Sequence, residues 1–259
     1  MITKIESNEA YHSSDAVSAS ALKTIHLKSV WHWLRDDFKG SDATNLGSAL
    51  HSILLEPETF DKEFAYAPEG AKRNTKAGKL IWEEFEAKNA GKVILKAPQQ
   101  AVITAIQNRF NNPDEDIKNC LPYMKGKIEL SHYLNYEGVP VRVRPDCLGE
   151  DFIMDIKTCS NSYGSVTPEW FAREINKRAY HIQGVFYCDM LGIDPDRFRF
   201  VVVETKAPYN IFLQKLNSDQ IYRGGVDYHE ALMDFKHYKE QGKVFKHKSN
   251  KLPDGAYEI

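Results

Sequence analysis

The sequence predicts a mixed α/β fold, in which a central mixed β-sheet is flanked by helices and preceded by a helical region. Three observations predict it. Helical patterns predominate in the first 122 residues, short alternating β segments begin after Gly126, and a long helix separates these from two further strands. Strands that alternate with helices are typical of a sheet with helices on its faces.

The N-terminal part is expected to be mostly helical. The first 16 residues are polar and predict a loop, and Leu46 to Leu55 predicts a helix that carries His51 and ends at Pro57. Further helices are predicted over 18–34, 77–89, 98–110 and 113–122.

The second half supplies the sheet. Three antiparallel strands are predicted over 127–135, 138–147 and 151–158, because apolar residues alternate there between turn residues. A helix over 167–191, strands over 198–204 and 210–215, and a helix over 218–241 follow. We therefore expect a single domain over 1–259, with a helical part (1–122), a core (123–245) and a tail (246–259).

Composition and the cysteines exclude several classes of protein. With 34 basic and 36 acidic residues and 42% hydrophobic residues, the chain is not wholly disordered. No secretion signal opens it, and no apolar run approaches the roughly 18 residues of a membrane span. We expect a soluble, cytoplasmic protein. The four cysteines contain no Cys-x-x-Cys pair, so we expect neither zinc nor an iron–sulfur cluster.

Three charged residues on adjacent predicted strands carry the most informative chemistry. Asp155 and Lys157 are two residues apart in one strand and so face the same side, about 6.6 Å apart. The preceding hairpin brings Asp146 beside them. Converging carboxylates bind a hard cation such as Mg²⁺ or Mn²⁺, which activates water against a phosphodiester, and an ammonium stabilises phosphate charge. The alternative is an ordinary surface ion pair on a strand.

Polar residues on two predicted helices add to this pattern. Gln183 and Tyr187 are one turn apart and lie on one face of the long helix. His51 lies in an otherwise apolar helix and is either a core histidine with its own partners or a third metal ligand. Gln183 and Tyr187 are open to a similar alternative, a half-buried helix with polar tips.

Taken in order, these motifs resemble the PD-(D/E)xK nucleases, in the branch that includes the RecB nuclease domain. The motifs are His51, Pro145-Asp146, Asp155-Ile-Lys157 and Gln183-Gly-Val-Phe-Tyr187. Within that branch the chain looks like the RecE-type exonuclease domain (exonuclease VIII) over residues 17 to 245. The segments that carry this resemblance are Val17–Lys23, Gly47–Pro57, Arg73–Lys79, Tyr180–Gln183 and Val203–Tyr209, with Asn74 as a departure where a basic residue is expected.

The resemblance implies a restriction-endonuclease-like core and a role for each motif residue. His51, Asp146 and Asp155 would bind the metal together with the backbone carbonyl of Ile156, and Glu129 is a second candidate ligand that is otherwise an exposed strand carboxylate. Catalysis would involve Asp146, Asp155 and Lys157, with Lys157 as the catalytic lysine. Gln183 and Tyr187 would orient the DNA backbone or the active-site groups.

Two groups of basic residues are candidate phosphate contacts. Arg73, Lys76 and Lys79 are spaced three apart at a loop-to-helix junction, and Arg142 and Arg144 share a strand face. The tail segment 243–248 is a further basic cluster. For each group, a solvated surface is the alternative.

By resemblance, the expected activity is that of a Mg²⁺-dependent (or Mn²⁺-dependent) exodeoxyribonuclease on linear double-stranded DNA ends. It would digest processively from 5′ to 3′, leave 3′ single strands, act with a RecT-like annealing protein in phage-type recombination, and form a homo-oligomeric ring, a tetramer being favoured. The alternatives are another PD-(D/E)xK nuclease, either an endonuclease or a single-strand exonuclease, and a catalytically silent DNA-end-binding protein.

Overall fold

The structure is a computed structural model that describes residues 1–36, 40–242, 244, 250–251 and 257–258. Most of the predicted tail (246–259), and most of the basic segment 243–248, lie outside the described residues. Among the described helices, none combines the length and the apolar character needed to cross a membrane.

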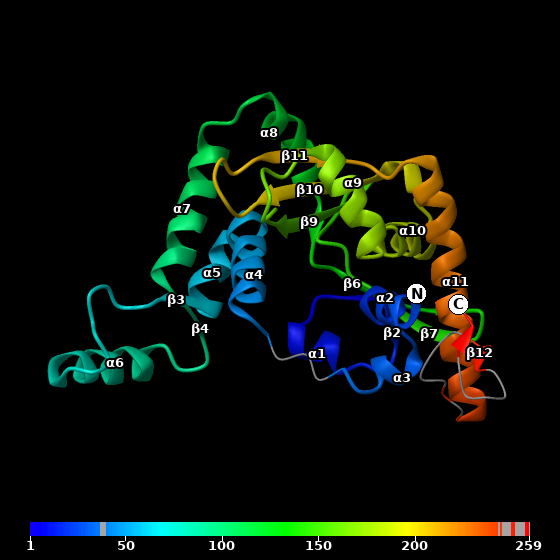
Figure 1. Ribbon diagram of the computed structural model, residues 1–259, viewed down its shortest axis with the longest axis horizontal. Coiled ribbons are helices and arrows are strands. Elements are labelled where there is room, and N and C mark those ends of the chain that lie inside the picture. Colours follow the sequence, from blue (N-terminus) through cyan, green and yellow to red (C-terminus); the bar gives the residue numbers. More distant parts are fainter. Residues whose placement is uncertain (37–39, 243, 245–249, 252–256, 259) are drawn as a thin grey trace.

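A five-stranded mixed sheet forms the centre of the fold, as predicted (Figure 1). Its strand order is β11-β10-β9-β8-β5. Strands β9 and β10 are parallel, and the other neighbours are antiparallel. The bounds are β5 Lys127–Ile128, β8 Cys147–Leu148, β9 Ile153–Cys159, β10 Phe198–Glu204 and β11 Ile211–Gln214.

The two faces of this sheet are covered by different helices. On β10, Phe198, Phe200 and Val202 pack in one core cluster, while Val201 and Val203 pack in another. This alternation is that of a strand buried on both sides. The first cluster packs with α2 (Ala19–Leu27), α9 (Pro168–Lys177), α10 (Tyr180–Leu191) and α11 (Ser218–Gln241), and the second packs with α4 (Asp42–Leu55), α5 (Pro57–Glu63), α7 (Ala97–Asn111) and α8 (Glu115–Cys120).

The predicted three-stranded meander was wrong, because the chain divides it between two sheets. A second sheet has the order β1-β6-β7-β2. The chain leaves the central sheet at Glu129, which has a positive φ of 48°, and returns to it through Pro145, which has no N–H for a ladder. The bounds are β1 Ile2–Lys4, β2 Val17–Ser18, β6 Ser131–Tyr136 and β7 Val139–Val143.

Three other element predictions were wrong. The N-terminal 16 residues contain β1 and the helix α1 (Asn8–His12) instead of a loop. The helix predicted over 18–34 ends at Leu27, and Ser29 begins the separate helix α3 (Val30–Trp33). The helix predicted over 167–191 divides at Ala179, which adopts a left-handed φ of 52°.

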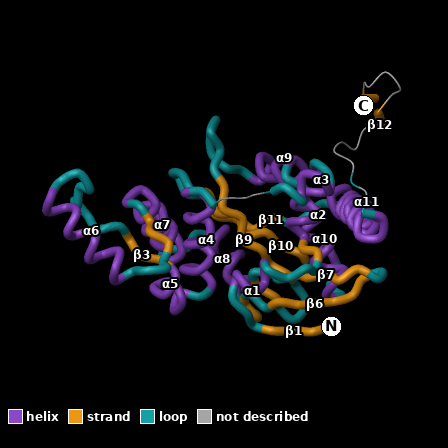
Figure 2. The backbone as a smooth tube through the Cα atoms, turned by 90° about the horizontal axis from the view of Figure 1, so that it is seen from below, coloured by secondary structure: helices purple, strands orange, loops and turns teal. Residues whose placement is uncertain are grey.

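One helix stands apart from the body of the protein. Helix α6 (Lys76–Lys88) projects beyond α7, joined through the short parallel pair β3 (Phe64–Tyr66) and β4 (Val93–Leu95) (Figures 1 and 2). Leu80 and Ile81 on α6 are 60% and 47% exposed. Three-residue strands leave too little periodicity to be predicted, so β3 and β4 were missed.

Two adjacent glycines on α11 should respond oppositely to alanine. At Gly224, an added Cβ would lie 2.7 Å from the His181 carbonyl oxygen and 2.5 Å from Val185 Cγ2 on α10. At Gly225, it would meet nothing within 4 Å. We expect Gly224→Ala to lower the free energy of unfolding by about 1–2 kcal/mol, and Gly225→Ala to raise it by up to about 1 kcal/mol. Urea unfolding measures both; equal effects would contradict this packing.

Candidate metal and hydrolytic site

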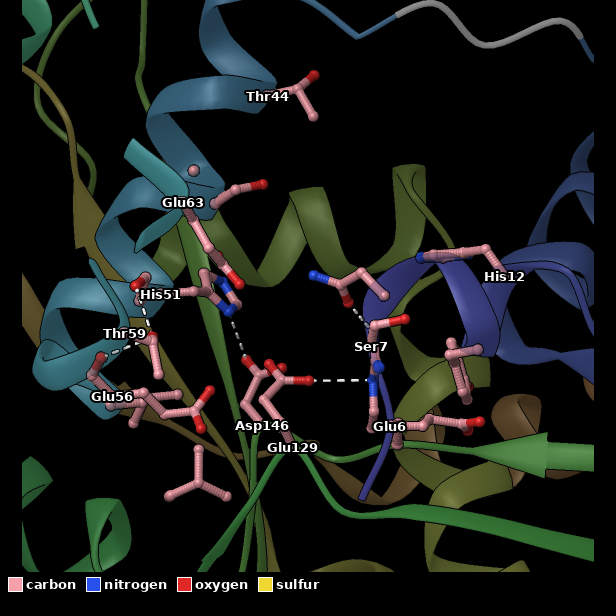
Figure 3. A pocket seen from close by; sticks show the side chains of 18 of the residues that line it. Glu6, Ser7, His12, Thr44, His51, Glu56, Thr59, Glu63, Glu129 and Asp146 are labelled. Carbon is pink, nitrogen blue, oxygen red and sulfur yellow. Dashed lines mark hydrogen bonds and ion pairs between the residues drawn. The ribbon is translucent and has the colours of Figure 1, made fainter. Parts of the chain in front are cut away.

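A cleft of about 770 Å³ opens where the two sheets separate. Figure 3 shows α4 on one side and the N-terminal segment with α1 on the other, with Asp146 and Glu129 between them. His51 enters from α4, and Tyr187 comes from α10. Five of the predicted site residues therefore line one cavity: His51, Glu129, Arg144, Asp146 and Tyr187.

A close approach between α4 and β9 allows His51 to reach the strand. One turn before His51 is Gly47, where a Cβ would lie only 3.1 Å from Thr158 Oγ1 of β9. From this position His51 Nε2 lies 3.1 Å from the carbonyl oxygen of Ile156. Gly47 is therefore explained by packing, because a side chain at this position would crowd β9.

Asp146 connects the histidine to β9. One carboxylate oxygen of Asp146 lies 3.3 Å from His51 Nδ1 and accepts a hydrogen bond from the backbone N–H of Ile156 at 2.6 Å. His51, Glu129 and Asp146 each offer one potential ligand atom, and these atoms lie within 4.8 Å of one another. The structure therefore brings together Asp146, His51, the Ile156 carbonyl and the second candidate, Glu129.

Asp155 and Lys157 face the same side of β9, as the period of two predicts. Lys157 Nζ lies 2.5 Å from Asp155 Oδ2, and Gln183 Nε2 donates to Asp155 Oδ1 at 2.5 Å. Lys157 Nζ also donates to Gln183 Oε1 at 3.0 Å. Met154 and Ile156 pack into the opposite core. Both oxygens of the Asp155 carboxylate are therefore engaged, Oδ2 by Lys157 and Oδ1 by Gln183.

The carboxyl groups of Asp146 and Glu129 are buried close to other carboxylates, and this raises their pKa values. Burial raises the pKa of Asp146 to about 6, and the charge of Asp155 adds to this rise. Burial raises the pKa of Glu129 to about 8, and Asp146 adds to that rise although Arg144 opposes it. A bound divalent cation would relieve this repulsion.

The donor set fits a hard divalent cation. Carboxylate oxygens from Asp146 and Glu129, the Ile156 carbonyl and the His51 imidazole would hold it, and such oxygen-rich sites suit Mg²⁺ or Mn²⁺. Bound there, the metal would act as a Lewis acid toward a phosphate oxygen and lower the pKa of a coordinated water.

The predicted basic residues do not form one surface. The Arg142 side chain is buried, donates to the carbonyls of Ser14 and His12, and lies over the Tyr11 ring. The prediction that Arg142 contacts phosphate is therefore not supported, because its guanidinium is already in contact with α1, a helix that was not predicted, and with the residues that follow it. Arg144 lines the cleft but pairs with Glu129 at 3.0 Å.

The other predicted basic group lies away from the cleft, with Arg73 in the turn before α6 and Lys76 and Lys79 on the helix. Arg73 pairs with Glu86 at 2.8 Å, and its guanidinium carbon lies 3.7 Å from the centre of the Trp82 ring. Lys76 and Lys79 are exposed on the first turn of α6.

Several cleft residues were missed by sequence reasoning. Glu6, Glu56 and Glu63 add carboxylates to its walls. Glu6 comes from the N-terminal segment, and Glu56 and Glu63 stand at the start and the end of α5, outside the motifs identified in the sequence. A weak indication existed for Glu56, which stands where α4 ends before Pro57; burial raises its pKa, and the nearby Glu58 and Glu63 add to that.

The fold and the site together define a member of the PD-(D/E)xK nuclease superfamily. Residues 18–249 match the family described as a PDDEXK-like domain of unknown function (DUF3799), and the chain belongs to that family. No curated protein matches it.

A solved structure shares this fold. It is a protein from Eubacterium rectale described as a putative exonuclease, with a TM-score of 0.62 and 14% sequence identity. The match covers 94% of this chain and 90% of that one. At this identity the likeness establishes the fold alone, and it extends over the N-terminal helical part as well as the sheet.

Cation binding should stabilise the protein through Asp146. We expect Mg²⁺ or Mn²⁺ to raise the melting temperature, by the equivalent of about 2.7 kcal/mol at a hundred times the dissociation constant. Asp146→Asn should lose this rise because it removes the ligand charge, while the exposed Glu230→Gln should keep it. Differential scanning calorimetry with and without EDTA measures this; an equal rise in Asp146→Asn would refute the site.

Proposed function

We propose that this chain is a Mg²⁺-dependent exodeoxyribonuclease that hydrolyses phosphodiester bonds of linear double-stranded DNA. The observation that carries the proposal is the grouping of Asp146, Asp155 and Lys157 beside an open cleft, with His51 in contact with Asp146. A hydrolytic nuclease is the coarser conclusion that superfamily membership supports.

The residues of the chain divide the work of hydrolysis between them. Asp146 and Asp155 would hold the metal with His51 and the Ile156 carbonyl. Lys157 carries an ammonium fixed between Asp155 and Gln183, and it can orient a water or stabilise charge on the phosphate oxygens. Tyr187, one turn after Gln183, is buried in the cleft wall, and burial raises its pKa, so its phenol stays protonated.

The finer parts of the proposal rest on the resemblance to RecE-type exonucleases. They are digestion from 5′ to 3′, processivity, 3′ single-stranded products, a RecT-like annealing partner, and a homo-oligomeric ring, favoured as a tetramer. The exposed Leu80 and Ile81 on the projecting α6 support a contact between subunits, because apolar side chains on an isolated helix favour a partner.

Removal of the charge of Asp155 or of Lys157 should abolish nearly all DNA digestion. We expect Asp155→Ala and Lys157→Ala each to lower the Mg²⁺-dependent rate at least about a hundredfold, because metal binding and charge stabilisation act in the transition state. Lys206→Ala, on an exposed turn, is the matched control. The assay measures nucleotides released from duplex DNA, with circular dichroism as the check on folding. Undiminished digestion by either folded variant would overturn the assignment of the catalytic residues.

Whether digestion requires a DNA end is tested by comparing end-labelled linear duplex with closed circular DNA, in Mg²⁺ and in EDTA. We expect digestion of the linear duplex alone, with the 5′ label released first. Cutting of the circle would instead indicate an endonuclease, and digestion of single strands only would indicate a single-strand exonuclease. Binding at ends without cutting would indicate a silent protein.

The lysines of α6 should contribute to DNA affinity if they contact phosphates. We expect Lys76→Ala and Lys79→Ala to weaken duplex binding and to reduce the salt dependence of the binding constant by about one phosphate contact each. Lys88→Ala, at the other end of α6, is the control. Fluorescence anisotropy, with Ca²⁺ as the divalent cation and over a series of salt concentrations, measures the binding constant. If its dependence on salt concentration were unchanged in both variants, the lysines of α6 would not contact the phosphates.

A further inference from the structure

A second lysine reaches the hydrolytic site from the N-terminal helix α2. Lys23 is one turn after Ser20, which lines the cleft, and its Nζ lies 3.4 Å from Gln183 Oε1 on α10. Lys157 Nζ donates to the same oxygen at 3.0 Å. The side-chain nitrogens of two lysines therefore meet on one neutral amide oxygen.

This arrangement fixes which way the Gln183 amide points. Its oxygen faces Lys23 and Lys157, and its NH₂ group donates to Asp155 at 2.5 Å. A flipped amide would place donors against ammonium groups and an acceptor against a carboxylate, so the charges on both sides oppose the flip.

Lys23 is placed there at an energetic cost. Within the described residues it has no carboxylate partner, and its other contact is with the Tyr180 ring, 5.2 Å from Nζ. Burial lowers the pKa of Lys23 to about 7, and the neighbouring Lys157 lowers it further. A neutral amine still carries N–H groups, so Lys23 can donate to Gln183 in either protonation state.

We infer that Lys23 is a positioning residue of the hydrolytic site, which holds the side-chain oxygen of Gln183 and thereby the amide that orients Asp155. This inference rests on the proposed nuclease function. When Lys157 donates a hydrogen bond to the substrate, its hydrogen bond to Gln183 weakens. Lys23 is then the second donor that keeps the Gln183 side chain in place.

Kinetics of Lys23→Met, Lys23→Arg and the exposed control Lys28→Met test the inference. We expect Lys23→Met to lower kcat about tenfold, the effect of one charge-assisted hydrogen bond, with KM and the salt dependence of binding unchanged. Lys23→Arg should recover most of the rate, and Lys28→Met should match the wild type. In a Gln183→Leu background, Lys23→Met should cause no further loss, because Lys23 acts through Gln183.

Other outcomes would overturn it. A further loss in the double variant, or a raised KM with a smaller salt slope, would show that Lys23 binds phosphate directly. An unchanged kcat in a folded Lys23→Met protein, or a loss that follows a lowered melting temperature, would also overturn it.

A measurement without DNA separates this inference from the proposed function. Mn²⁺ affinity, measured by calorimetry on the protein alone, should weaken in Lys23→Met, and should not weaken further when that change is added to Gln183→Leu. If the wild type binds Mn²⁺ but cuts no DNA, the proposed function fails, and this comparison still decides the role of Lys23.

Discussion

Strand β9 is buried on both faces, and yet it carries two charges in its middle. Asp155 is only 2% exposed, so its carboxylate requires partners within the protein. Lys157 and Gln183 meet that requirement from one side, and the backbone of the same strand is held from the other by Asp146 and His51. Helix α10 supplies Gln183 to this carboxylate, and α4 supplies His51 to the backbone carbonyl of Ile156 on the same strand.

Much of this could be predicted from sequence where the information is local. The period of two placed Asp155 and Lys157 on one face, and the limits of β10 and α11 follow from apolar runs and caps. The division into two sheets could not be predicted, since it depends on a left-handed Glu129 and a return through Pro145. The burial of Arg142 also escaped prediction, because it depends on α1, a five-residue helix whose stability comes from tertiary contacts. The roles assigned to the site residues stay predictions.

The charge of the cleft gives a different meaning to the near-neutral composition. Glu6, Glu56, Glu63, Glu129 and Asp146 line it, and Arg144 is already paired. Under the proposed function, such walls would repel the phosphates of DNA, so bound divalent cations would be needed for the duplex to approach. Net charge over the whole chain, at −2, conceals this local imbalance.

The N-terminal segment has a practical consequence for anyone who trims the protein to its recognised domain. The family match begins at residue 18, but Glu6, Tyr11 and His12 form one wall of the cleft, and Arg142 is covered by α1. A recombinant fragment cut at the family boundary would keep every motif residue and still lose a side of the cavity. In such a fragment the guanidinium of Arg142 would be exposed, so measurements on the fragment would describe a site with a different charge.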